Sequence, residues 1–459
     1  MSRFVRSVER LLRCLADHAP HRSTPGAGLA AATAVVTAAV LLGPADLAVA
    51  EPETPARYPS ASSSTRVSGL GFDTCTAPSL SALRAWRASS YRTVNIYFGG
   101  RNRACKQPNL TSAWVRDATA MGWKLLPTYV GYQPACMLGT KTYRYTSSTA
   151  TSRGTSDAND AVARAKALGL LPGSALYADI EHYDRSNSSC RTSVRRYASA
   201  WTKTLHVAGY VAGVYVHQNS GLRDLSATYN SLSYARPDAV WVARWDGRTS
   251  LTGWPTAPNT QWSTWQRVKQ YRGDHNETWG GVRMNIDSDA LRAPVATVAR
   301  RYTVTSRTAL NARTGPSTSY PVARSHASGS SLSVVCQTRG KKVGTSPVWD
   351  RLSDGTWVSD YYVSTPSSSG FSSALPLCMY PGQVTASALN ARSGPGTSYS
   401  TSGGALQRGS LAYVVCQKTG TRVGTSSVWN KLPDGRWVSD YYVSNRSNTS
   451  WSAPVPRCP

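Results

Sequence analysis

The sequence predicts an α/β protein in which a (β/α)8 TIM-like barrel is followed by two small all-β modules. Between residues 67 and 296, eight short apolar runs alternate with amphipathic segments. The last third of the chain repeats itself and has no helical periodicity. A length of 459 residues accommodates one large and two small domains.

Residues 1–50 have the pattern of a secretory signal peptide. Arginines at the start precede an apolar run over residues 29–42, and Ala48-Val49-Ala50 follows as a small-residue cleavage motif. This run is shorter than the roughly 20 residues of a membrane-spanning helix, so cleavage after Ala50 is favoured over a retained anchor. The mature protein is then extracellular, with no stable membrane span. Residues 51–66, rich in Pro, Ser and Ala, are predicted to be a flexible linker.

The composition is strongly basic, with 51 Lys and Arg residues against 24 acidic residues and a net charge of +27. Residues 1–50 hold five arginines and three acids, so their removal leaves +25. Outside the cell such a surface favours anionic envelope polymers over nucleic acid, or serves solubility alone. The sequence carries no indication of an oligomeric state.

Eight cysteines follow residue 50, an even number that suits an oxidising compartment. Cys336 and Cys378 are separated by 42 positions, as are Cys416 and Cys458, which predicts one disulfide in each repeat. The other four cysteines permit three pairings. The preferred pairs are Cys75–Cys105 and Cys136–Cys190. No two cysteines have the close spacing of a zinc site, and neither a metal nor a cofactor is predicted.

The barrel domain is assigned to residues 67–296. Its predicted strands are residues 70–73, 93–98, 125–130, 175–180, 211–215, 239–243, 268–271 and 282–287. Its predicted helices are residues 79–88, 111–121, 156–168 and 193–208. The clearest helix has Asp157 and Asp160 near its start and Gly169 as a stop. A doubly wound open sheet is the alternative, but no glycine-rich phosphate loop follows the first strand.

The repeat defines two modules, residues 302–378 and 381–458. Residues 334–364 and 414–444 agree at 22 of 31 positions. Each copy opens with Leu-Asn-x-Arg-x-Gly-Pro-x-x-x-Tyr, which ends at Tyr320 and Tyr399 and resembles bacterial SH3-like domains. The resemblance implies envelope-targeting modules that hold short peptides in aromatic grooves. The groove candidates are Trp357, Tyr361, Tyr362, Trp437, Tyr441 and Tyr442.

Four acidic residues are predicted to line one pocket at the barrel mouth. Asp179 and Glu181 lie two apart at the end of a predicted strand and so share a face. Asp73 ends the first predicted strand and Asp287 the eighth, and these strands are neighbours in a closed barrel. Paired carboxylates suit glycoside cleavage, because mutual repulsion keeps a proton on one of them. A solvated strand edge or a structural salt bridge is the alternative.

Polar and aromatic residues near the strand ends are predicted to bind a sugar, although aromatic side chains also fill barrel cores. These substrate-binding candidates are Tyr97, Tyr129, Tyr215, Trp241, Gln270 and Tyr271.

Several of these segments together resemble the secreted actinobacterial glycoside-hydrolase-like domain, which is similar to the family 25 lysozymes. They are Gly71-Phe72-Asp73, Tyr97-Phe98-Gly99-Gly100, Pro127-Thr128-Tyr129, Tyr177-Ala178-Asp179-Ile180-Glu181, Trp241-Val242-Ala243-Arg244-Trp245 and Ile286-Asp287. The resemblance implies a peptidoglycan-like substrate and substrate-assisted cleavage, with Glu181 as the acid, Asp179 steadying an N-acetyl group, and Asp73 and Asp287 positioning or polarising.

The sequence therefore favours a secreted, cell-wall-directed glycoside hydrolase. The alternatives are a barrel that binds glycan without cleaving it and an envelope scaffold with an inert barrel.

Overall fold

The computed structural model describes residues 64–458 except 264, 373, 445–448 and 453–454. The predicted signal peptide and most of the predicted linker lie outside the described residues. Among the helices of the described part, none combines the length and apolar character that crossing a membrane requires.

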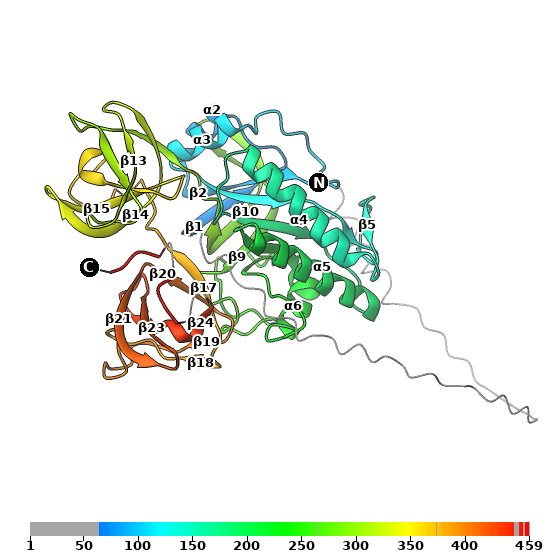
Figure 1. Ribbon diagram of the computed structural model, residues 1–459. Coiled ribbons are helices and arrows are strands. Elements are labelled where there is room, and N and C mark those ends of the chain that lie inside the picture. The colour runs from blue at the N-terminus through cyan, green and yellow to red at the C-terminus, as the bar shows by residue number, and fades with distance from the viewer. Residues whose placement is uncertain (1–63, 264, 373, 445–448, 453–454, 459) are drawn as a thin grey trace, which may run out of the picture. The chain divides into compact units, whose positions relative to one another are not determined.

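Eight strands close into a barrel, which confirms the predicted fold class (Figure 1). Each strand overlaps one of the eight predicted runs. The strands are β1 (Thr65–Asp73), β2 (Tyr91–Gly99), β3 (Lys124–Tyr129), β6 (Ala175–Ile180), β7 (Val211–His217), β8 (Ala239–Ala243), β9 (Arg267–Trp279) and β10 (Val282–Val295). Their order around the barrel is β1, β10, β9, β8, β7, β6, β3, β2.

The last barrel strand departs from a regular (β/α)8 repeat. β10 runs antiparallel to both of its neighbours, β9 and β1, whereas the other adjacent strands are parallel. Only Gly280 and Gly281 separate β9 from β10, both with positive φ. Two residues can make a hairpin turn but not a helical crossover, so the chain reverses direction here. Asp287 consequently lies within β10, not at its end.

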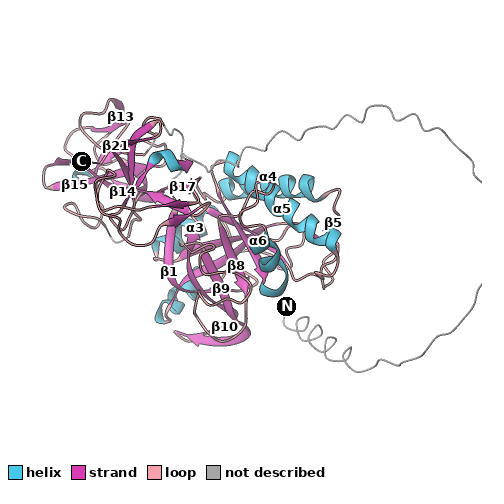
Figure 2. Cartoon of the chain, turned by 90° about the horizontal axis from the view of Figure 1, so that it is seen from below, coloured by secondary structure: helices cyan, strands magenta, loops and turns pink. Residues whose placement is uncertain are grey.

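Helices cover the outside of the barrel, and α4 and α5 lie side by side (Figure 2). Their bounds are α2 (Leu80–Ala85), α3 (Ser112–Ala120), α4 (Ala150–Ala167), α5 (Ser188–Val207) and α6 (Arg223–Ala227). The helix predicted over residues 156–168 begins six residues earlier than expected. Asp157 does not cap it, because its carboxylate is buried and accepts hydrogen bonds from Tyr132 N (2.8 Å) and Tyr197 Oη (2.7 Å).

The lower part of the barrel interior is filled by apolar side chains, including Tyr177 and Trp241. Tyr177 packs directly over Gly213 of the adjacent strand, where a Cβ would lie 2.3 Å from the ring. This close approach explains the glycine in the middle of the strand. The polar side chains of the barrel interior lie at its opposite end.

Two β modules follow the barrel. The first is one six-stranded sheet made of β11 (Arg300–Thr303), β14 (Ser331–Val343), β15 (Ser346–Leu352), β16 (Trp357–Ser359), β12 (Leu310–Arg313) and β13 (Val322–His326). The second contains β17 (Tyr380–Val384), β18 (Ala388–Leu389), β19 (Leu406–Gln407), β20 (Leu411–Val414), β21 (Cys416–Val423), β22 (Ser426–Lys431), β23 (Trp437–Ser439) and β24 (Val443–Ser444).

The repeated opening motif forms the same local turn in both modules. Arg313 donates a hydrogen bond to the carbonyl of Tyr320 (2.8 Å), and Arg392 donates to that of Tyr399 (2.7 Å). The Tyr320 ring lies on Gly315, where a Cβ would come within 2.6 Å of it. Arg, Gly and Tyr of the motif therefore stabilise a turn.

All four predicted disulfides are present, including the preferred pairing in the barrel. They are Cys75–Cys105, Cys136–Cys190, Cys336–Cys378 and Cys416–Cys458. Such bonds persist in oxidising compartments and fit an extracellular location.

Candidate active site

The barrel mouth brings together carboxylates from its first and last strands. Asp73 at the end of β1 is paired in register with Asp287 of β10. Gln270 of β9 links them, because its Nε2 donates to Asp73 Oδ2 (2.8 Å) and to Asp287 Oδ2 (3.1 Å). Tyr97 Oη donates to the other Asp73 oxygen (3.0 Å). The antiparallel course of β10 thus sets these two acids face to face.

A third acid of this group, Asp289, was not predicted. It is buried, and the indole N–H of Trp241 donates to its Oδ1 (2.8 Å). Asp289 lies two residues after Asp287, so the period of two in a strand could have identified it. The predicted candidate Trp241 is itself only 1% exposed and lies in the barrel interior, against this acid.

The pKa values of these three acids are raised. Burial is the largest cause at each, and it raises the pKa of Asp73 and Asp289 well above the ordinary value and that of Asp287 to about 6. The negative charge of Asp287 adds to the rise at Asp73, and that of Asp73 adds to the rise at Asp289. Desolvation and repulsion both disfavour the charged carboxylate.

Asp179 and Glu181 stand at the end of β6. Asp179 is 4% exposed, and its Oδ1 has no hydrogen-bond partner among the described residues. Glu181 directly follows the strand and is half-buried. Asp179 is in register with Tyr215 of β7. The pKa of Tyr215 is raised by burial and then by the charges of four carboxylates, which are those of Glu181, Asp179, Asp73 and Asp287. All four predicted acids therefore lie near the hydroxyl of Tyr215.

The pKa shifts of Asp179 and Glu181 have different causes. Burial raises the pKa of Glu181, and the positive charge of Lys141 opposes the rise. At Asp179, burial and then the charge of Glu181 raise the pKa well above its usual value, again opposed by Lys141. The sequence analysis expected mutual repulsion to keep a proton on one of the paired acids; repulsion acts at Asp179, whereas the rise at Glu181 comes from burial. Both groups tend to hold a proton at a higher pH than a solvated acid.

The predicted aromatic candidates divide between the two faces of the barrel wall. Tyr97 and Tyr215 belong to the mouth, where Tyr215 Oη donates to Gln270 Oε1 (3.1 Å). Tyr129 points outward and donates to Asp160 of α4 (2.7 Å). Tyr271 follows the inward-facing Gln270 and therefore faces outward, near Tyr91. The alternation of side chains in a strand separates these residues.

Trp245 is an aromatic residue of the mouth that was not among the predicted binding residues. The residue is 46% exposed, and its indole N–H donates to Gln270 Oε1 (2.9 Å). The ring lies against the backbone of Gly273, where a Cβ would come within 2.3 Å of it. Trp245 is thus held in place by contacts to β9 while a large part of its ring faces solvent.

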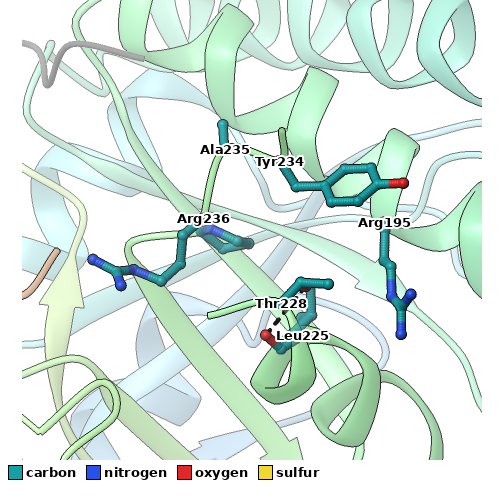
Figure 3. A pocket seen from close by; sticks show the side chains of 7 residues that line it. Arg195, Leu225, Thr228, Tyr234, Ala235 and Arg236 are labelled. Atoms are coloured by element: carbon teal, nitrogen blue, oxygen red, sulfur yellow. Dashed lines mark hydrogen bonds between the residues drawn. The ribbon is translucent and has the colours of Figure 1, made fainter. Parts of the chain in front are cut away.

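A small pocket lies elsewhere on the barrel, between α5, α6 and the segment before β8 (Figure 3). None of the five carboxylates of the mouth lines it. Arg195, one of its two basic residues, pairs with the buried Asp224 (Nη2–Oδ1, 3.4 Å). The lining residues are Arg195, Leu225, Thr228, Tyr234, Ala235, Arg236 and Pro237. Across the residues described, no group of three or more His, Cys, Asp or Glu side chains could hold a metal ion.

Part of the barrel is similar to a known family model. Residues 84–291 match the family model of the Rv2525c-like, glycoside hydrolase-like domain. The match lies entirely within the barrel and includes Asp179, Glu181, Gln270 and Asp287. Among curated proteins, none matches the chain.

Three solved structures are similar to parts of this chain. The Mycobacterium tuberculosis Tat-secreted protein Rv2525c in complex with L-tartrate is 17% identical, with 49% of this chain and 96% of that one covered and a TM-score of 0.35. The modular Cpl-1 endolysin complexed with a peptidoglycan analogue is 9% identical, covers 64% of each chain and has a TM-score of 0.29. A GH18 chitinase from Pseudoalteromonas aurantia is 11% identical, with coverage of 43% and 79% and a TM-score of 0.27.

Proposed function

We propose that the protein is a secreted, cell-wall-directed glycoside hydrolase that cleaves an N-acetylated glycan such as peptidoglycan. The main support is the carboxyl group of Asp179, which is buried with one oxygen lacking a partner among the described residues. Leaving a buried acceptor without a donor is costly. The amide N–H of a substrate N-acetyl group would supply that donor, next to the acid Glu181.

The proposed reaction assigns one role to each member of the pair. Glu181 donates its proton to the glycosidic oxygen as the bond to the leaving sugar breaks. The acetamido oxygen of the substrate attacks the anomeric carbon, while Asp179 accepts the acetamido N–H and steadies the developing positive charge. The raised pKa of Glu181 keeps its proton available closer to neutral pH. Asp73 and Asp287, joined through Gln270, position the floor of the pocket.

Sugar binding is assigned to the aromatic residues of the mouth. Trp245 presents an exposed ring that Gly273 and Gln270 hold in place, which suits stacking on a pyranose. The hydroxyls of Tyr97 and Tyr215 lie among the acids and can contact sugar hydroxyls. Trp241 lies deeper in the barrel and supports the site by donating a hydrogen bond to Asp289.

The two β modules are proposed to attach the enzyme to the wall polymer. Tyr361 and Tyr441 occupy equivalent places, and each ring lies against a glycine with positive φ, Gly344 or Gly424. Tyr361 is 37% exposed. Trp357 and Trp437, by contrast, are buried, so the proposed groove does not include them. Two linked weak contacts gain avidity on a repetitive polymer.

The deciding experiment measures release of reducing ends by the full secreted chain from chitin and from its deacetylated form. Wild type should act on the acetylated polymer. Asp179→Asn should lose most of that activity while still binding the polymer. If wild type binds acetylated glycans but releases nothing from chitin or peptidoglycan, the hydrolase proposal fails. The non-catalytic glycan-binding alternative, which the exposed ring of Trp245 also supports, would then take its place.

Attachment by the modules is tested with insoluble cell-wall sacculi. Exchanging both Tyr361 and Tyr441 for Ala should weaken binding of the full chain, with Val207→Ala, an exposed position on α5, as the control. Salt should weaken but not abolish binding, because a screened attraction from the basic surface adds to the groove contacts. Loss of all binding at about 0.5 M salt would indicate charge alone, since the screening length is then only a few ångström.

A further inference from the structure

The backbone that carries Asp179 and Glu181 is held unequally on its two sides. Towards β7, strand β6 is paired along its whole length, from Ala175 to Ile180. Towards β3, it is paired only at Tyr177 and Ala178. The chain leaves β3 after Tyr129, so no strand lies beside the last residues of β6 on that side.

The side chain of Gln133 fills this gap. Its Nε2 donates to the carbonyl of Asp179 (2.6 Å), and its Oε1 accepts from the N–H of Glu181 (2.9 Å). Gln133 is fully buried in the short strand β4 (Gln133–Pro134), which follows β3. A primary amide offers one donor and one acceptor, as a peptide unit does. Gln133 therefore replaces a missing strand neighbour at the two acids.

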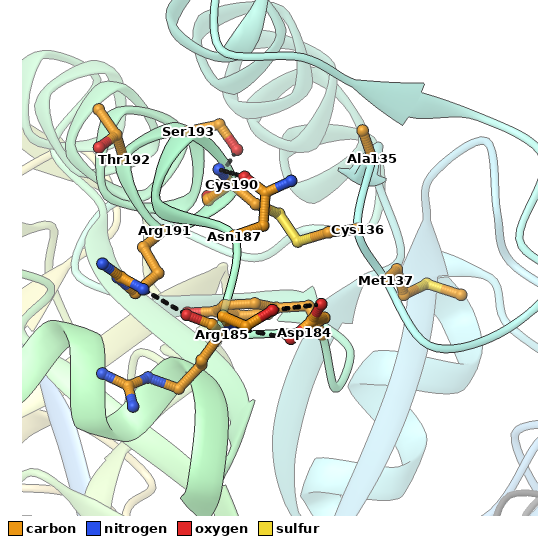
Figure 4. Close-up of a disulfide and its surroundings, with 12 residues drawn as sticks. Ala135, Cys136, Met137, Asp184, Arg185, Asn187, Cys190, Arg191, Thr192 and Ser193 are labelled. Carbon is orange, nitrogen blue, oxygen red and sulfur yellow. Dashed lines mark hydrogen bonds between the residues drawn. A yellow bond between two sulfur atoms is a disulfide. The ribbon is translucent and has the colours of Figure 1, made fainter. Parts of the chain in front are cut away.

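The pairing continues past Glu181. Leu138 N donates to the carbonyl of His182 (2.9 Å), and Asp184 N donates to that of Cys136 (3.0 Å). Residues 136–138 thus pair antiparallel with residues 182–184, and residues 133–138 form a strip that contacts the backbone on both sides of Glu181. Cys136 in the strip is joined to Cys190 in the first turn of α5 (Figure 4). The disulfide fixes the strip to the helix that leads back from the site.

We propose that Gln133 is a positioning residue for Glu181 and that the Cys136–Cys190 disulfide locks the strip that carries it. This inference rests on the proposed function, in which Glu181 is the general acid. Both side-chain hydrogen bonds of Gln133 go to the backbone around the acids, so it acts by fixing where the Glu181 carboxyl points. A displacement of about 1 Å at a catalytic group can reduce the rate by about 10²-fold.

The test compares Gln133→Met with Gln107→Met in the full chain. Gln107 is a matched control, because it makes the same two-pronged contact to a backbone segment, from Ala77 N (2.8 Å) and to the Cys75 carbonyl (2.7 Å), beside the other barrel disulfide. Gln133→Met should lower kcat about 10- to 100-fold with little change in KM and should shift the pH–rate profile. Gln107→Met should lower Tm to a similar degree and leave kcat and the profile unchanged.

The disulfide is tested in the same way. Replacing Cys136 and Cys190 by Ser should lower kcat and shift the pH–rate profile in the same direction as Gln133→Met. The Cys75 and Cys105 double Ser variant is its control. All rates are measured well below the Tm of each variant, so that folded protein is compared with folded protein.

Two results would overturn the inference. One is an active wild type whose Gln133→Met variant keeps its kcat and pH–rate profile, and the other is an equal loss in Gln107→Met. Failure of the proposed function is seen separately, as a wild type with no turnover. In that case a carbon-13 titration of Glu181 decides, because Gln133→Met should move its pKa and leave that of Glu277 unchanged. An unmoved Glu181 pKa would also overturn the inference.

Discussion

A pair of carboxyl groups at the barrel mouth can be compared with a pair in the first β module. Asp179 and Glu181 form the first pair, and Asp350 and Asp360 the second. Burial is the largest cause of a raised pKa in all four groups, and within each pair the second acid adds to the rise, at Asp179 and at Asp350. By electrostatics alone the two pairs look alike.

The pairs differ in how their oxygens are occupied. In the module, Gln337 Nε2 donates to Asp350 Oδ1 (2.8 Å) and to Asp360 Oδ1 (2.9 Å), and Thr365 Oγ1 also donates to Asp360 (2.6 Å). The two carboxyls also hydrogen-bond to each other, which requires a proton on one of them. The pair sits inside the module core. A raised pKa therefore indicates burial alone, and the mouth pair differs from the module pair by its place at a strand end and by the partial exposure of Glu181.

The second module supports this distinction. Asn430 stands where the first module has Asp350, and its Nδ2 donates to Asp440 Oδ1 (3.0 Å). Gln417 takes the place of Gln337, with bonds to Asn430 Oδ1 (2.8 Å) and Asp440 Oδ1 (3.0 Å). An amide thus performs in one module what a protonated carboxyl performs in the other. At the position of Asp350 the network needs a donor and not an acid.

The largest expected effect separates the two pairs by activity. Glu181→Gln keeps the shape of the side chain but removes the transferable proton, so turnover should fall by about 10² to 10⁴ while glycan binding survives. Asp350→Asn should leave turnover unchanged. Reducing-end release and a binding isotherm for each variant measure the two effects. Full activity in Glu181→Gln would mean that the pocket has been misassigned.

The next largest expected effect is a difference between the two modules in how their stability depends on pH. The pKa of Asp350 is raised in the folded protein, so its contribution to stability is complete below its unfolded pKa of about 4 and is lost as the pH rises towards the folded pKa. Within that window the first module should lose about 1.4 kcal/mol per pH unit for one linked proton. Asp350→Asn should remove this dependence, and Asn430→Asp should create it in the second module.

Hydrogen exchange in the intact chain measures how the stability of each module depends on pH. Peptides from residues 331–352 are compared with peptides from residues 411–431 between about pH 5 and 9. Equal pH dependence of the two modules in wild type would contradict the role given to Asp350. If the first module of the Asp350→Asn variant still loses stability as the pH rises, the titrating proton belongs to another group.

The smallest expected effect is a difference between the pKa values of two glutamates. Glu51, Glu53, Glu181 and Glu277 are the glutamates after residue 50, so carbon-13 labelling of glutamate gives four signals to assign. Burial raises the pKa of Glu181, whereas hydrogen bonds from Trp279, His275 and Tyr91 outweigh burial and lower that of Glu277. The two carboxyl signals should titrate on opposite sides of about pH 4.3. Titration of Glu181 below Glu277 would remove it as the general acid.

Much of the fold could be predicted from the sequence, because local patterns encode it. Period-two and apolar runs located all eight barrel strands, and the duplication located the modules and their disulfides. The D-x-E pattern at the end of β6 likewise follows from strand geometry, since Asp179 lies on the strand and Glu181 just beyond it.

Other features were decided by tertiary structure. The two-glycine turn made β10 antiparallel, and that course set Asp287 opposite Asp73 and brought Asp289 into the group. Tyr129 and Tyr271 face outward because each follows an inward-facing residue, a phase that depends on barrel closure. Trp245 and Gln133 act through contacts to segments distant in sequence, Gly273 and residues 179–181. Local periodicity reports which residues share a face, whereas the identity of the neighbour across a gap is set only when the chain packs.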